Sequence, residues 1–362
     1  MSKFGPIRLN EQYQERIWGG QKLRGLYGKA IPSDKPIGEA WMVSDHPGNE
    51  SVVTEGPHAG RTLHDLIRED PVALLGTRAQ PTPHGRFPLL LKILDAREVL
   101  SVQVHPDDET ARRLNEPDVG KTEMWHVLQH EPDAQLICGI YHDVTRERFL
   151  DVADSSGVED LMIRFEVEDG TSVFVPAGTV HAIGAGIVLA EIQQNSDITY
   201  RLYDFGRLGP DGRPRQLHVQ KAFESIHFGS THGGPSRPLA IARDGATRTV
   251  LAACRYFAAE SIEVHQSYRR VTGGNSFHIL LAKTGSLTVT ADSQSIALAQ
   301  AQALLLPGEL TEFTVEGPGA FLDYYVPDLQ EDILTPLQNA GHTLDEILPL
   351  GGDPKTNDLI SP

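Results

Sequence analysis

Hydrophobic residues along this chain fall mainly in short runs, and many of the runs alternate apolar and polar positions. The segment EVLSVQVH (98–105) shows the alternation, whereas FPLLLKIL (87–94) is a continuous apolar run of strand length. Stretches with the 3.6-residue period of a helix are scarce, and 34 glycines and 24 prolines separate the runs. Short strands divided by turns are typical of sandwiches and barrels, so the pattern predicts a mainly β protein. Further strands are expected at 123–128, 134–140, 172–176, 186–195 and 198–205.

A few short helices are predicted among these strands. In the first, Leu63, Leu66 and Ile67 share one face, as a helix packed on a core requires. In the second, acidic residues precede Arg112 and Arg113, the order that the helix dipole favours. The predicted helices are 61–70, 105–115 and 145–154.

The chain is predicted to divide after a polar segment rich in glycine and proline at 229–238. A second set of strands follows between 277 and 326. We therefore expect two β-domains and a turn-rich tail to which the sequence gives no role. Their predicted bounds are 1–235 for a catalytic domain, 236–330 for a smaller second domain and 331–362 for the tail.

Charge and composition narrow the class of partner. The formal net charge of the 362-residue chain is −17, which argues against a nucleic acid or an anionic membrane surface. No apolar run is long enough to span a membrane, and the two cysteines cannot form a disulfide framework for a chain of this size. We expect a cytoplasmic protein that acts on a small molecule, with local basic residues to bind any anionic group.

Two histidines lie in sequence patterns that could position them as metal ligands. Strand alternation within 98–105 places Gln103 and His105 on the face opposite Val102 and Val104. Read alone, this is better explained as a half-solvated strand. The second pattern, GTSVFVPAGTVHAI (170–183), combines a strand, a Pro-Ala-Gly turn and then His181 at the start of a returning strand. Such a turn would hold one imidazole at a fixed point in a β-barrel.

These motifs together resemble a known family. In this order, VQVHPDD, GKTEMWHVL, VPAGTVHAI and TYRLYDFGR are similar to the type I mannose-6-phosphate isomerases in their short bacterial form, which are members of the cupin superfamily. ERIWGGQKL (15–23) and IGEAWMVSDHPG (37–48) resemble the opening of that family, and the likeness extends over roughly 7–325. The resemblance implies two jelly-roll-like cupin β-barrels.

The resemblance also implies one zinc ion per chain. Carried over by motif, the ligands are Gln103, His105, Glu123 and His181. Two imidazoles and a carboxylate suit a catalytic zinc that keeps an open position, whereas an amide oxygen is a poor donor, so Gln103 is either a ligand or a support for one. Most cupins have H-x-H in the first motif. The glutamine, and the eighteen positions from His105 to Glu123, both favour the isomerase family.

The second set of strands lacks a matching ligand set. ALLLPGELTEFTV (303–315) contains a Pro-Gly turn but no histidine after it, and no Q-x-H precedes it. His278 stands alone in its strand, where a structural role is the more common one. We expect a second cupin without a metal.

Four charged residues are candidates for binding and catalysis. Lys92 lies within an apolar strand, where an unpaired ammonium would be costly, although it could reach solvent or pair with an acid. Lys121 could form an ordinary salt bridge, and Arg201 could pair with Glu191 or Asp204. The resemblance favours substrate contacts for Lys92 and Lys121 and a catalytic role for Arg201. Glu191 is a candidate for the group that carries the proton, as is a water on the metal.

The implied reaction is the interconversion of mannose 6-phosphate and fructose 6-phosphate through a cis-enediol. It needs a base, a group that stabilises the enediolate and a phosphate contact, but no redox cofactor. Two alternatives are a related metal-dependent isomerase of another sugar, possibly unphosphorylated, and a sugar-binding cupin without catalysis. The sequence does not indicate the oligomeric state.

Overall fold

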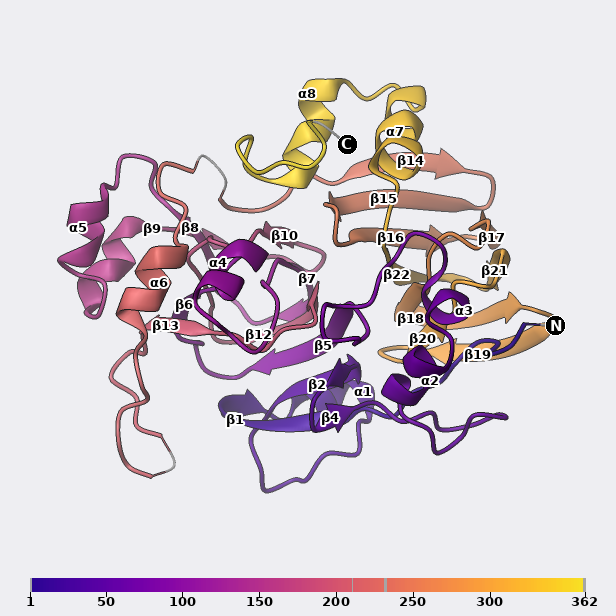
Figure 1. Ribbon diagram of the computed structural model, residues 1–362, viewed down its shortest axis with the longest axis horizontal. Helices are drawn as coiled ribbons and strands as arrows, with labels where there is room; N and C mark the ends of the chain where they lie inside the picture. Colours follow the sequence, from indigo (N-terminus) through magenta and orange to yellow (C-terminus); the bar gives the residue numbers. More distant parts are fainter. Residues whose placement is uncertain (1, 210, 231–232, 361–362) are drawn as a thin grey trace.

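The protein is built mainly from β-sheets, as the computed structural model shows (Figure 1). The structure describes residues 2–209, 211–230 and 233–360. The predicted fold class, a mainly β protein of the cupin type with a few short helices, is confirmed. No helix in the described ranges is long and apolar enough to cross a membrane.

Two facing sheets form the first barrel, and a buried apolar cluster with members from both sheets fills the space between them. Trp125 and Leu94 enter this cluster from one sheet, and Leu136 and Ile183 enter it from the other. The six-stranded sheet runs in the order β1 (Gln12–Gly20), β2 (Ile37–Val43), β5 (Leu89–Ala96), β12 (Ile187–Gln194), β7 (Glu123–His130), β10 (Ser172–Val175). The five-stranded sheet runs in the order β13 (Tyr200–Tyr203), β6 (Val102–Val104), β11 (His181–Ile183), β8 (Gln135–Ile140), β9 (Met162–Glu166).

The second barrel is one curled nine-stranded sheet organised around β18 (His278–Ala291). This strand pairs with four others because its two halves reach different parts of the sheet. Those partners are β19 (Gln294–Ala299), β20 (Ala303–Leu306), β21 (Glu312–Glu316) and β22 (Gly319–Tyr325). The other strands are β14 (Leu239–Arg243), β15 (Ala246–Ala253), β16 (Ala258–Val264) and β17 (Ser267–Val271).

The two barrels share a continuous apolar core between their outer faces. Leu91 and Ile192 of the first barrel belong to the same buried cluster as Leu281 and Leu322 of the second. Both residue pairs are essentially inaccessible to solvent. The barrels therefore form one packed body, with the first on one side of the molecule and the second on the other (Figure 1).

The helices are short and lie outside the sheets. The three predicted ones are present as α2 (Leu63–Glu69), α4 (Asp108–Arg113) and α5 (Arg146–Leu150). The predicted first helix does end before Pro71, but a second helix, α3 (Pro71–Leu75), begins at once because proline is favoured in the first turn. The remaining helices of the first 230 residues are α1 (Lys22–Tyr27), the 3₁₀ turn η1 (Ser156–Leu161) and α6 (Val219–Ser225).

The C-terminal tail is folded against the second barrel. It contains η2 (Leu329–Leu334), α7 (Thr335–Asn339), α8 (Leu344–Ile347) and η3 (Leu348–Gly351). Its apolar side chains form a buried cluster with residues of β14, β15 and β22. The expected chain division at 229–238 falls partly on residues 231–232, which lie outside the described ranges.

Candidate metal centre and active site

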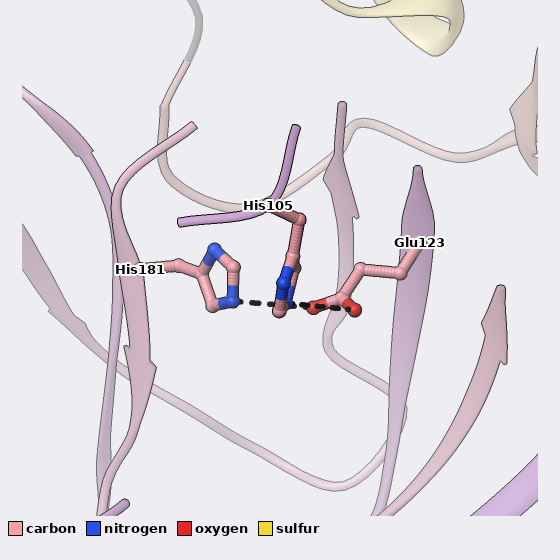
Figure 2. A group of neighbouring side chains, drawn as sticks. All are labelled: His105, Glu123 and His181. Carbon is pink, nitrogen blue, oxygen red and sulfur yellow. Dashed lines mark ion pairs between the residues drawn. The ribbon is translucent and has the colours of Figure 1, made fainter. Parts of the chain in front are cut away.

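Three buried side chains of the first barrel meet at one point. His105 directly follows β6, Glu123 opens β7 and His181 opens β11, and their ligating atoms all lie within 4.8 Å of one another. Glu123 faces both imidazoles: its Oε2 is 3.5 Å from His105 Nε2 and its Oε1 is 3.4 Å from His181 Nε2 (Figure 2). The structure therefore brings together three of the four residues that the resemblance implied as ligands.

The turn after β10 explains how His181 reaches His105. Gly178 has a φ of +85°, a left-handed conformation that favours glycine, and a Cβ there would lie 2.6 Å from the ring of His227. Its N–H donates to the carbonyl oxygen of His105 at 2.8 Å. The turn is thus fastened to the chain at the first histidine, and β11 starts beside it.

Backbone carbonyls orient both imidazoles. His105 Nδ1 is 2.7 Å from the carbonyl oxygen of Ile198, and His181 Nδ1 is 2.8 Å from that of Thr179. Each Nδ1 must be the donor, which leaves the lone pair of Nε2 free to bind a cation. Burial lowers the pKa of His181 to about 3, and burial together with Lys121 lowers that of His105 well below its usual range. Both rings are therefore neutral at pH 7.

The carboxylate of Glu123 completes a set of donors suited to a divalent cation. Both of its oxygens are buried and accept no well-aligned hydrogen bond within the described part of the chain, and Lys121 Nζ forms an ion pair with Oε2 at 3.2 Å. Burial raises the pKa of this group to about 7, although Lys121 opposes the shift. A buried carboxylate that faces two free imidazole nitrogens makes a set of donors that a divalent cation would satisfy. Two nitrogens and a carboxylate are common ligands of zinc, so the residues present fit the implied metal.

Gln103 lies beside this set. Its Nε2 is 3.3 Å from His181 Nε2, and the residue pairs with His181 across β6 and β11. The oxygen and nitrogen of an amide are told apart only by their hydrogen bonds, so a rotated amide would place its oxygen at the same point. Its assignment as a ligand therefore stays a prediction.

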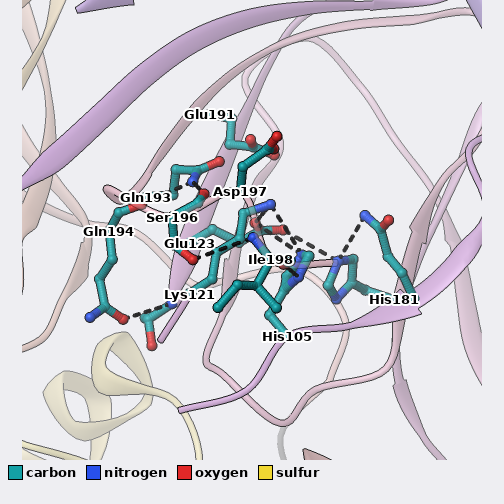
Figure 3. Close-up of polar contacts among 12 residues, drawn as sticks. His105, Lys121, Glu123, His181, Glu191, Gln193, Gln194, Ser196, Asp197 and Ile198 are labelled. Atoms are coloured by element: carbon teal, nitrogen blue, oxygen red, sulfur yellow. Dashed lines mark hydrogen bonds and ion pairs between the residues drawn. The ribbon is translucent and has the colours of Figure 1, made fainter. Parts of the chain in front are cut away.

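A cleft of about 390 Å³ is lined by Gln103, which contacts His181, and by Lys121, which contacts Glu123. All four charged candidates line it. Lys92 Nζ is 3.2 Å from Glu191 Oε1. Lys121 Nζ is 3.2 Å from Glu123 Oε2 (Figure 3). Burial lowers the pKa of Lys121, but the carboxylates of Glu123, Glu191 and Asp197 outweigh it and raise the pKa above its usual value. Lys121 therefore stays charged.

Arg201 also reaches the cleft, and neither of the salt bridges considered for it forms. Its Nη1 donates to the carbonyl oxygen of Gln216 at 2.9 Å, and its buried Nε has no partner among the residues the structure describes. Asp204 instead binds Arg207 and Arg215. Burial, with help from Arg215, lowers the pKa of Arg201. A half-buried guanidinium with an unused N–H is well placed to bind an anionic oxygen.

Four further charged residues line the cleft that sequence reasoning did not select: Arg16, Glu39, Asp197 and Arg215. Asp197 lies in the loop between β12 and β13 and lines the same cleft as Glu191 (Figure 3). Asp197 could have been selected from the sequence, because it lies between two strands of the site and four residues before Arg201. Arg16 and Arg215 had no such signal, because folding alone brings their segments to the cleft.

Comparisons with known proteins agree with this geometry. A family model described as "Phosphomannose isomerase type I, catalytic domain" matches residues 7–136, and one described as "Mannose-6-phosphate isomerase, cupin domain" matches residues 247–326. A probable mannose-6-phosphate isomerase of Bacillus subtilis is 37% identical over 322 residues, which are 88% of this chain and 98% of that relative. The chain belongs to the type I phosphomannose isomerase family.

Other members of this family align over similar lengths. The mannose-6-phosphate isomerase of Streptococcus mutans is 34% identical over 313 residues, which are 86% of this chain and 95% of that protein. A crystal structure of the mannose 6-phosphate isomerase from Bacillus subtilis superposes with a TM-score of 0.81 at 32% identity and covers 88% of this chain and 99% of that one. The family resemblance inferred from the motifs is therefore confirmed.

Proposed function

We propose that this protein is a zinc-dependent isomerase that interconverts mannose 6-phosphate and fructose 6-phosphate. The observation that carries the proposal is the buried set of His105, Glu123 and His181, with free donor atoms that converge beside a cleft lined by lysine and arginine. Relatives named for this activity align over nearly their whole lengths, which supports it. The division at residues 235 and 330, the location in the cytoplasm and the ligand role of Gln103 stay predictions.

The side chains of the cleft supply the other requirements of the reaction. Zinc, held by the three ligands, would supply a Lewis acid that polarises substrate oxygens. Lys92 and Lys121 offer ammonium groups to the sugar phosphate, and Arg201 offers an unused N–H to the oxygen that becomes negative in the enediolate. The cleft thus holds cations for both the phosphate and the reacting end of an open-chain sugar.

The proton must move between C2 and C1 on one face of the enediol. Both oxygens of Glu191 already have donors, Lys92 Nζ at 3.2 Å and Trp125 Nε1 at 3.0 Å. Those donors orient the carboxylate of Glu191. Asp197 is exposed and lines the same cleft, so it joins Glu191 as a candidate for the proton carrier.

A coupled isomerase assay on mannose 6-phosphate, with zinc quantified in the same sample, tests the proposal. We expect turnover that disappears when a chelator removes the metal and returns when zinc is added back. Equal rates before and after removal would refute the role of zinc. Absence of turnover in a zinc-loaded sample, with proton exchange at C2 of the sugar also absent, would refute the isomerase.

A further inference from the structure

The chain between His105 and Glu123 leaves the first barrel, forms α4 and returns to the same place. The base of this excursion is closed, because the N–H of Lys121 donates to the carbonyl oxygen of Pro106 at 2.9 Å. A Cβ on Gly120 would lie 2.5 Å from the backbone nitrogen of Asp108. The returning chain is thus pressed against the first turn of α4, which sets its position.

Two side chains hold the backbone N–H groups of the returning chain. Asp108 Oδ1 accepts from the N–H of Gly120 at 2.8 Å and from Gln194 Nε2 at 3.0 Å. Gln194 Oε1 accepts in turn from the N–H of Thr122 at 2.9 Å (Figure 3). These bonds flank Lys121 and precede Glu123. The carboxylate of Asp108 therefore helps to fix the backbone that carries two side chains of the active site.

The other oxygen of Asp108 binds the second barrel. Tyr256 lies in the turn between β15 and β16, and its hydroxyl donates to Asp108 Oδ2 at 2.7 Å. The turn is itself fastened to the tail, because Asp358 accepts from the N–H of Arg255 at 2.8 Å and from its Nε at 2.7 Å. A tyrosine of the second barrel is thus delivered to the segment that carries Lys121 and Glu123.

This hydroxyl contributes little to holding the barrels together. The shared apolar core joins them, and the exposed carboxylate of Asp108 could bind water in place of Tyr256. We propose that Tyr256 is a positioning residue of the active site, which acts through Asp108 on residues 120–123 and makes turnover depend on a side chain of the second barrel. The kinetic part of this inference rests on the proposed isomerase function.

Tyr256→Phe tests the inference because it removes the hydroxyl and keeps the ring. Tyr324→Phe is the matched control, since its buried hydroxyl has no hydrogen-bond partner among the residues described. The full-length proteins are compared for kcat and KM on mannose 6-phosphate, zinc per chain, melting temperature and amide hydrogen exchange of residues 120–123. Tyr256→Phe should lower kcat by about threefold to tenfold, the effect of one lost hydrogen bond. Exchange at 120–122 should become faster, while zinc content and melting temperature match those of Tyr324→Phe.

A second pair of variants tests whether Asp108 acts through its hydrogen bonds or through its charge. Asp108→Asn keeps an oxygen for the N–H of Gly120 and should retain most of the turnover, whereas Asp108→Ala should lose at least as much as Tyr256→Phe. The inference is wrong if Tyr256→Phe equals its control in both kcat and exchange, or if it lowers only the melting temperature. A parent protein without isomerase activity would refute the proposed function instead, and the exchange comparison would still decide the inference.

Discussion

Two buried glutamates show how side-chain surroundings separate a functional site from a structural one. Glu123 has an ion pair with Lys121 but accepts no well-aligned hydrogen bond in the described structure, and burial raises its pKa to about 7. Glu260 of the second barrel accepts from Arg248, Arg270 and Tyr325. Burial would raise its pKa too, but Arg248 and Arg270 outweigh that effect and lower it to about 2. Glu260 is already neutralised by its neighbours, whereas Glu123 has oxygens left for a cation.

The pH dependence of stability follows from this contrast. Glu260→Gln should lower the free energy of unfolding at pH 7 by about 3 to 5 kcal/mol, because it leaves the buried Arg248 without its anion. The pKa of Glu260 is depressed in the folded state. The stabilisation by its carboxylate is therefore complete above about pH 4.5 and is lost as the pH falls towards 2. Denaturant unfolding should show a smaller difference in the free energy of unfolding between parent and variant at pH 3 than at pH 7. Glu263→Gln on the same strand, with an exposed side chain, is the control and should change little at either pH.

Arg201 should separate metal binding from turnover. Arg201→Ala removes a group that contacts none of the three ligands, so zinc content should stay at one per chain while kcat falls by about a hundredfold, as when one donor to a developing oxyanion is lost. His181→Ala should lose zinc and turnover together. Arg164→Ala, which breaks the ion pair of that arginine with Glu159 on the surface, should match the parent in both measurements. A fall of zinc in step with kcat in Arg201→Ala would show that the arginine is structural.

At the scale of elements, turns and loop bases place the ligands more than the strands do. His105 lies just past the end of β6, and His181 begins a three-residue strand after a tight turn. The N–H of Gly178 in that turn binds the carbonyl oxygen of His105. The geometry of the metal centre therefore depends on one left-handed glycine.

Two glycines that flank β10 allow this dependence to be measured. Gly178→Ala should cost about 1 to 2 kcal/mol for its backbone conformation and more for contact with His227, and should weaken zinc binding. Gly170→Ala has a similar φ of +91° but open space around its Cβ, so it should carry only the backbone cost. Zinc affinity by competition with a chromophoric chelator, and unfolding free energy, distinguish the two. Equal zinc affinities would mean that the turn does not set the position of His181.

Local signals in the sequence predicted many of the elements, and the motifs that carry the family resemblance contain the three residues that the structure brings together. Hydrophobic alternation marked most strands of the first barrel, and the turn motif marked His181. The sequence did not predict strands β14 to β17. One reason is that segments such as Ala258–Val264 are rich in alanine and glutamate, which are depleted in strands. Asp197 and Gln194 could not be assigned roles, because those roles depend on which loops meet after folding. The packing of the tail could not be predicted either, because the surface against which it packs is formed by β14, β15 and β22.

At the scale of the whole molecule, apolar surfaces join the parts that the sequence separates. The outer faces of the two barrels share one core, and the tail adds a cluster that covers β14 and β15. Through Arg255 and Asp358 the tail also fixes the turn that carries Tyr256. The tail is thus an integral part of the second barrel.

Two leucines of the tail test this integration. Leu337 is fully buried against the second barrel, so Leu337→Ala should lower the free energy of unfolding by about 2 to 5 kcal/mol. Leu344 is 47% exposed, and Leu344→Ala should change the free energy of unfolding by no more than about 0.5 kcal/mol. Denaturant unfolding followed by tryptophan fluorescence provides the measurement. Similar small effects in both variants would mean that the tail is only loosely attached.

The closed base of the excursion between His105 and Glu123 has a consequence for recognising such proteins from sequence. The site constrains where the chain leaves and where it returns, through Pro106, Asp108 and Gly120, but not how far it travels in between. Insertions or deletions within the excursion would leave both ligands in place. A search pattern with a fixed gap between the two ligands would therefore discard genuine relatives, whereas one that requires a glycine three positions before the glutamate and lets the gap vary would retain them.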